Sequence, residues 1–196
     1  MKETFYRQYM SQVIFLNGIS SSGKTSIAKA IQYLAQIPFL HIGVDTLIEM
    51  MPARYLSFAS KAREGCYFEE HHNEHGKMIL CNTGGEFGEK VFHMGVQIIK
   101  TIVNSDLNLI IDEVVWNVNR MNEYKEALCN HKVLFIKVFC SRSVAQEREI
   151  LRGNRAIGLA NGQFDMLNSM QWQYDIEINT EQISSFKCAK NILSSL

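Results

Sequence analysis

Prolines are scarce in this sequence, and its cysteines are not paired. Only Pro38 and Pro52 occur among 196 residues, and no Gly/Ser-rich linker divides the chain. Because domain boundaries usually fall in such linkers, we expect one domain over residues 1–196. The cysteines number five and form no C-x-x-C pair. This argues against a disulfide framework and favours reduced thiols in a cytosol.

An excess of charge of either sign is also lacking. The 20 basic and 20 acidic side chains balance, and no basic stripe suggests a nucleic-acid partner. The first ten residues are polar, without the apolar core of a signal peptide, and no apolar stretch reaches the roughly 20 residues that span a membrane. We therefore expect a cytoplasmic protein without a membrane or nucleic-acid partner. The sequence leaves open whether copies of the chain form a homo-oligomer.

Apolar runs alternate with amphipathic stretches along the chain. Strands are expected at residues 12–17, 39–44, 108–115, 133–140 and 175–179. Helices are expected at residues 24–36, 46–51, 89–103, 121–129, 144–151 and 181–196. Such alternation is typical of a parallel sheet covered by helices. The sequence thus predicts an α/β fold with a five-stranded parallel sheet between two helical layers.

One segment fits a phosphate-binding motif in full. Residues 18–25 read G-I-S-S-S-G-K-T, which matches G-x-x-x-x-G-K-[ST], and they lie between a predicted strand and a predicted helix. The glycines let successive backbone N–H groups point inward, and the positive end of the helix faces the same way. The alternative is a Gly/Ser-rich turn with a solvated Lys24 and Thr25. The residues expected to contact a nucleotide are Gly18, Ile19, Ser20, Ser21, Ser22, Gly23, Lys24, Thr25 and Ser26.

The motif implies ATP and Mg²⁺ as cofactors of a P-loop NTPase fold of the kinase kind. Lys24 would place a positive charge near the β- and γ-phosphates, and the Thr25 hydroxyl would bind Mg²⁺. Asp112 follows an apolar run, a setting suited to holding Mg²⁺ directly or through water. For the next residue, Glu113, the sequence leaves open a direct role and an exposed or ion-paired position.

Asp45 is the candidate for proton transfer. Ligands of open α/β sheets bind beyond the carboxyl ends of the strands, and Asp45 ends a different predicted strand from the phosphate loop. An acceptor hydroxyl lying between the two would lose its proton to Asp45. The alternative is that Asp45 only caps the helix that follows it.

Two further segments need an interpretation. Residues 53–88, with short hairpin arms at 66–69 and 78–81 and a turn at 83–85, are taken as a variable insertion on the acceptor side. Residues 152–163 are polar and contain glycine, and we interpret them as a lid.

Three arginines, Arg148, Arg152 and Arg155, precede or belong to this lid. They would neutralise the charge that develops on the transferred phosphate. The alternative is a solvated helix face, because Arg148 and Arg152 stand four residues apart beside Glu147 and Glu149.

Other chemistry-bearing side chains carry weaker signals. His71, His72 and His75 lack a fourth ligand at metal-site spacing, so a solvated loop is expected there. A set of large apolar residues either lines an acceptor pocket or belongs to the core: Met50, Met51, Phe68, Met94 and Trp116.

Several of these stretches together resemble the chloramphenicol 3-O-phosphotransferase family. The similar stretches, in the family's order, are residues 14–26, 43–52 (GVDTLIEMMP), 110–114, 147–155 and 174–180. The resemblance implies a P-loop kinase fold and ATP-dependent phosphorylation of an alcohol. It also implies that Asp45 is the general base and that Arg152 and Arg155 are lid arginines at the phosphates. Lys24 completes the set of expected catalytic residues.

The sequence departs from the family mainly in residues 53–107 and after Ala160, where residues 164–173 also differ. These regions should supply much of the acceptor pocket. We expect an O-phosphotransferase acting on chloramphenicol, as in antibiotic resistance, or on a related hydroxyl compound. The alternatives are a toxin-like nucleotide-sugar kinase, a nucleotide kinase, and a non-catalytic nucleotide-binding switch. The nucleotide-kinase lid signature D-G-x-P-R and the GTPase and transporter signatures N-K-x-D and L-S-G-G-Q are absent.

Overall fold

A central parallel sheet organises the molecule. The computed structural model describes residues 10–72, 76, 78–153 and 156–196. Five parallel strands lie in the order β2-β6-β1-β7-β8, which confirms the predicted sheet. Their bounds are β1 Gln12–Asn17, β2 Phe39–Gly43, β6 Asn108–Glu113, β7 Lys132–Phe139 and β8 Ile176–Asn179.

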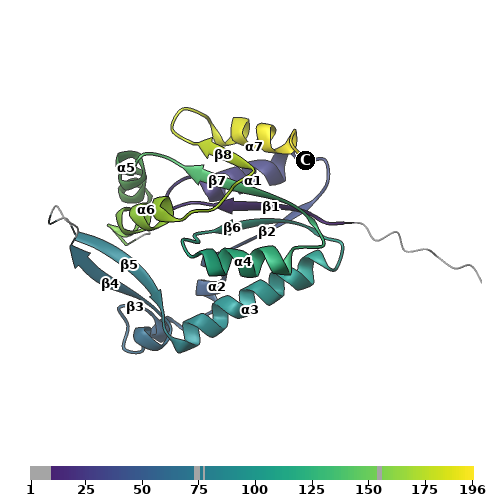
Figure 1. Ribbon diagram of the computed structural model, residues 1–196. Coiled ribbons are helices and arrows are strands. Elements are labelled where there is room, and N and C mark those ends of the chain that lie inside the picture. Colours follow the sequence, from purple (N-terminus) through teal and green to yellow (C-terminus); the bar gives the residue numbers. More distant parts are fainter. Residues whose placement is uncertain (1–9, 73–75, 77, 154–155) are drawn as a thin grey trace, which may run out of the picture.

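Helices cover both faces of this sheet. Helices α1 (Lys24–Leu34) and α7 (Ser185–Leu193) lie on one face, and α3 (Glu86–Val103) and α4 (Val118–Ala127) lie on the other (Figure 1). Three more helices are α2 (Val44–Glu49), α5 (Arg142–Arg152) and α6 (Leu159–Ser169). The result is the predicted three-layer α/β arrangement.

The apolar run of β1 shows why this sequence forms a central strand. Ile14 and Leu16 are fully buried against α1 and α7, whereas Val13 and Phe15 are fully buried against α3 and α4. Successive side chains of a strand point to opposite faces, so a strand covered on both sides must be apolar throughout.

A smaller sheet stands beside the central one and carries the predicted hairpin (Figure 1). It contains β3 (Leu56–Ser57), β4 (Cys66–His72) and β5 (Met78–Gly84), together with the 3₁₀ helices η1 (Ala53–Tyr55) and η2 (Ala62–Glu64). The hairpin arms are confirmed and are longer than expected. The turn expected at residues 83–85 is wrong.

The end of β5 is a strand and not a turn. Gly84 pairs with Cys66 in the ladder. A Cβ on Gly84 would lie 2.5 Å from the Glu89 carboxylate, the far end of a flexible side chain that can move away, so packing does not require glycine there.

The segment interpreted as a lid is partly a packed helix. Residues 159–163 begin α6 and are buried. The buried Glu149 carboxylate accepts hydrogen bonds from the backbone N–H groups of Gly158 and Ala160, both at 2.8 Å. A carboxylate in this place satisfies donors that a helix start otherwise leaves unpaired. Closure as a lid stays a prediction for the part of residues 152–163 that precedes this helix, and Arg155 lies outside the described residues.

Across the described parts of the chain, no helix is both long and apolar enough to cross a membrane. All five cysteines are free thiols.

Candidate active site

The phosphate loop has the geometry that its motif requires. It joins β1 to α1, and its backbone takes positive φ at Ser21 (61°) and Gly23 (101°). A Cβ on Gly18 would lie 2.1 Å from the Val138 carbonyl oxygen, so only glycine fits there. Lys24 is 7% exposed, and its Nζ donates to the carbonyl oxygens of Gly18 and Ile19 at 2.9 and 3.0 Å. The alternative of a solvated lysine after an ordinary turn is therefore wrong.

Thr25 and Asp112 meet at the carboxyl edge of the sheet. The Thr25 hydroxyl donates to Asp112 Oδ2 at 2.7 Å, and Lys24 Nζ lies 3.7 Å from Asp112 Oδ1. His41 belongs to no motif of the sequence, and its Nε2 lies 3.6 Å from Asp112 Oδ2. Burial by itself would raise the pKa of Asp112, but Lys24, His41 and Thr25 outweigh it and lower the pKa. Asp112 is therefore held as a carboxylate.

These groups fit the phosphates of a nucleotide and a magnesium ion. Among the described residues, the buried hydroxyls of Ser21 and Ser22 have no hydrogen-bond partner. Buried donors beside the positive end of a helix suit the oxygens of a polyanion. A hydroxyl and one carboxylate are the kind of partial ligand set that Mg²⁺ uses when phosphates and water complete its shell.

No metal centre built from protein side chains alone is evident among the residues that the structure describes. Within them, no group of three or more His, Cys, Asp or Glu side chains is placed to hold a metal ion. His71 and His72 are exposed on β4, and His75 lies outside the described residues.

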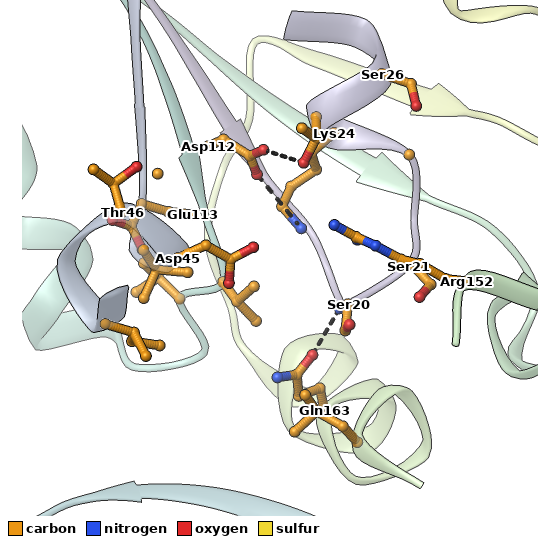
Figure 2. Close-up of a pocket in the computed structure, with 18 of the residues that line it drawn as sticks. Ser20, Ser21, Lys24, Ser26, Asp45, Thr46, Asp112, Glu113, Arg152 and Gln163 are labelled. Atoms are coloured by element: carbon orange, nitrogen blue, oxygen red, sulfur yellow. Dashed lines mark hydrogen bonds and ion pairs between the residues drawn. The ribbon is translucent and has the colours of Figure 1, made fainter. Parts of the chain in front are cut away.

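Asp45 lies across the cavity from the phosphate loop. It belongs to the first turn of α2, whose N-cap is Gly43, so the interpretation of Asp45 as a helix cap is wrong. Strand β2 is separated from β1 by β6, which places Asp112 between the loop and Asp45. All three line one cavity, and Figure 2 shows Asp45 on one side of it with Lys24 and Arg152 on the other.

Glu113 is buried and is not exposed or ion-paired at the surface. Its Oε1 accepts a hydrogen bond of 3.0 Å from the Tyr124 hydroxyl. Burial, together with the neighbouring negative charge of Asp112, raises the pKa of Glu113 to about 7. It lines the same cavity as Asp45, so a protonated carboxyl can stand there at neutral pH.

The arginines of α5 do not share one environment. Arg148 donates to the hydroxyl and the carbonyl oxygen of Thr180 at 2.9 and 2.8 Å, and the Thr180 hydroxyl donates to the Ser22 carbonyl at 2.7 Å. Arg148 is thus anchored to the phosphate loop, and the solvated-face interpretation fails for it. Arg152 is exposed and lines the cavity, where its guanidinium points toward the loop (Figure 2).

The cavity, of about 1490 Å³, continues from the loop toward the small sheet. Its acceptor side is lined by Glu49, Leu56, Phe58, Cys66, Phe68, Glu89, Phe92, Trp116, Asn117, Arg120 and Tyr124. Of the apolar residues named from the sequence, Phe68 and Trp116 line it. Met51 is instead part of the core, and Met50 and Met94 are exposed.

Gln163 contacts the phosphate loop from a distant part of the chain. This buried side chain of α6 accepts a hydrogen bond of 2.7 Å from the backbone N–H of Ser20, in the phosphate loop. The contact joins residues 143 positions apart, and no local pattern marks it.

Known proteins share this architecture. The chain is 15% identical to a gluconokinase from Sinorhizobium meliloti 1021, with a TM-score of 0.60 and 96% of each chain covered. It is 10% identical to the APS kinase CysC of Mycobacterium tuberculosis, with a TM-score of 0.61 and 94% and 96% of the two chains covered. At these identities the likeness establishes a P-loop kinase fold.

Sequence relatives are more informative about the reaction. A Mycobacterium tuberculosis protein named "Putative O-phosphotransferase" is 26% identical over 184 residues, which cover 94% of this chain and 81% of the relative. A family model described as chloramphenicol phosphotransferase-like protein matches residues 11–196. The chain therefore belongs to the chloramphenicol phosphotransferase-like family, and it is an enzyme that transfers phosphate to a hydroxyl group.

Proposed function

We propose that this enzyme uses ATP and Mg²⁺ to phosphorylate a hydroxyl of a small molecule, either chloramphenicol or a related compound. One observation carries the proposal. A carboxylate, Asp45, shares a cavity with a phosphate loop and with the Thr25–Asp112 pair that lies between them. Phosphoryl transfer to an alcohol needs these parts in this relative order.

The residues that line the cavity have separate roles in phosphoryl transfer. The amides of the phosphate loop and Lys24 bind the β- and γ-phosphates, and Thr25 and Asp112 hold Mg²⁺, which neutralises charge on the phosphates when it is bound. Asp45 accepts the proton of the acceptor hydroxyl. Arg152 lies over the loop and stabilises negative charge on the transferred phosphoryl group.

The acceptor side favours an uncharged compound with an apolar body. Phe58 and Phe68 pack with tilted rings whose centroids lie 5.6 Å apart, and both line the cavity. The Arg120 guanidinium on the same side already forms ion pairs with Glu89 (2.7 Å) and Glu123 (3.2 Å). Because these carboxylates neutralise the Arg120 guanidinium, the acceptor side of the cavity favours a nucleotide or a nucleotide sugar little. The phosphates of such acceptors need unpaired cations.

Transfer of labelled phosphate from ATP tests the proposal. Chloramphenicol, other hydroxyl antibiotics, nucleoside monophosphates and sugar nucleotides are compared as acceptors with Mg²⁺ present. Preferred labelling of a phosphate-bearing acceptor would contradict the proposed acceptor class.

Asp45→Asn tests the proton acceptor. We expect turnover to fall about a hundredfold to ten-thousandfold while nucleotide affinity stays unchanged. Asp106→Asn is the control, because Asp106 is exposed and asparagine readily adopts its positive φ of 59°. Turnover close to that of the control would refute the role of Asp45.

A further inference from the structure

The orientation of the Gln163 amide is determined by its partner. The backbone nitrogen of Ser20 can only donate, so the group that faces it at 2.7 Å must be the Gln163 oxygen. The NH₂ group of the amide therefore points away from the loop backbone, as Figure 2 shows.

The NH₂ group is left for a ligand. Among the described residues, the one hydrogen bond of the Gln163 side chain is the one that its oxygen accepts from Ser20, although Gln163 is only 4% exposed. Gln163 also lines the cavity that holds the phosphate loop. Two N–H donors are thus available to whatever occupies this part of the cavity.

The donors lie at the end of the loop where the terminal phosphates bind. Lys24, whose ammonium group pairs with β- and γ-phosphates in such loops, reaches the carbonyl oxygens of Gly18 and Ile19. Ser20 follows directly in the chain. The Gln163 amide therefore stands beside the γ-phosphate position and not beside the nucleoside.

Helix α6 holds Gln163 rigidly. The Glu149 carboxylate accepts both Gly158 N–H and Ala160 N–H at the start of the helix. On the other side, Leu80 N–H of β5 donates to the Gly158 carbonyl at 3.2 Å, and Gly162 packs against the Leu80 carbonyl. A donor fixed in advance stabilises developing charge more than one that must be ordered during the reaction.

We propose that Gln163 is a catalytic residue that donates a hydrogen bond to an oxygen of the transferred γ-phosphoryl group. The inference rests on the proposed function. In the transfer step the acceptor oxygen forms a bond to the γ-phosphorus, the bond to the β-phosphate oxygen breaks and leaves ADP, and the acceptor proton passes to Asp45. Gln163 keeps its protons and its contact with Ser20, and it stabilises charge on the γ-phosphoryl oxygens.

Gln163→Glu separates this role from a merely structural one. A glutamate of the same shape still accepts the Ser20 N–H, but it has no donor and adds a negative charge. We expect the affinity for a non-hydrolysable ATP analogue to fall about tenfold to a hundredfold, whereas the affinity for ADP should change less than about twofold. The kcat should fall together with the affinity for the ATP analogue. Isothermal titration calorimetry with Mg²⁺ measures both affinities.

Two other variants complete the test. Gln163→Met removes the hydrogen bond from Ser20 and the proposed one to the γ-phosphate without adding charge. Distortion of the loop would weaken ADP and the ATP analogue alike and leave the ratio of their dissociation constants unchanged. The loss of the donor weakens only the ATP analogue, so the ratio of the ADP to the ATP-analogue dissociation constant should still fall. Asn168→Asp adds the same charge at an exposed position of α6 and should leave the ratio unchanged. A wild-type ratio in Gln163→Glu would overturn the inference alone. A wild-type protein that binds neither nucleotide would overturn the proposed function, and the inference with it.

Discussion

Replacing Gly162 with alanine should destabilise the contact between helix α6 and the small sheet. A Cβ on Gly162 would lie 2.1 Å from the Leu80 carbonyl oxygen and 3.0 Å from its carbon. Ordinary contacts between carbon and oxygen begin near ~3.3 Å, so the helix or the strand must move by about 1 Å. Leu80 pairs with Glu70 within the hairpin, so its carbonyl has little freedom to yield.

The cost follows from two opposed effects. Overpacking against backbone costs about 3 kcal/mol, at the upper end of its usual range, because no side chain can rotate away. Alanine in place of glycine inside a helix returns about 1 kcal/mol. The free energy of unfolding should therefore fall by about 2 kcal/mol, which corresponds to a Tm lower by about 4 to 8 °C.

Gly95→Ala is the matched control for this change. Gly95 is also a buried helical glycine, and its added Cβ would lie 2.3 Å from Leu47 Cδ1, the far end of a flexible side chain. Leucine can change rotamer, so we expect a loss below about 1 kcal/mol. Urea unfolding of both variants measures the difference. A Gly162→Ala protein as stable as wild type, or as stable as Gly95→Ala, would refute the reasoning.

Two further predictions concern the carboxylates at the end of β6. The raised pKa of Glu113 means that the folded protein keeps this proton up to about pH 7, whereas the unfolded chain releases it near 4.5, so wild-type stability falls as pH rises between these values. Glu113→Gln has no carboxyl to titrate and should not lose stability in this way. In urea unfolding with EDTA, its free energy of unfolding should exceed that of the wild type by about 3 kcal/mol at pH 8 and equal it at pH 4. Parallel pH profiles of the two proteins would contradict the raised pKa of Glu113. Asp112→Asn removes a carboxylate beside Thr25, so the Mg²⁺ concentration for half-maximal turnover should rise about tenfold to a hundredfold, and an unchanged Mg²⁺ titration would exclude Asp112 as a ligand.

Local sequence determined the parts of this protein that depend on neighbours along the chain. The apolar run of β1, the glycines at positions 18 and 23 and the Lys24–Thr25 pair identify a strand, a phosphate loop and a helix start. Each of these obeys a local rule of backbone conformation or burial, and the structure has them where the sequence predicts them. The same holds for the five parallel strands, whose alternation with helices is visible in the apolar pattern alone.

Tertiary structure alone decided which distant side chains meet. Gln163 reaches Ser20 because α6 packs on β5, and His41 reaches Asp112 because β2 lies beside β6. No characteristic spacing in the sequence predicts either contact, because each depends on the order in which strands and helices lie side by side in space. The raised pKa of Glu113 has the same origin: burial and a neighbouring charge produce it, and both exist only once the chain has folded.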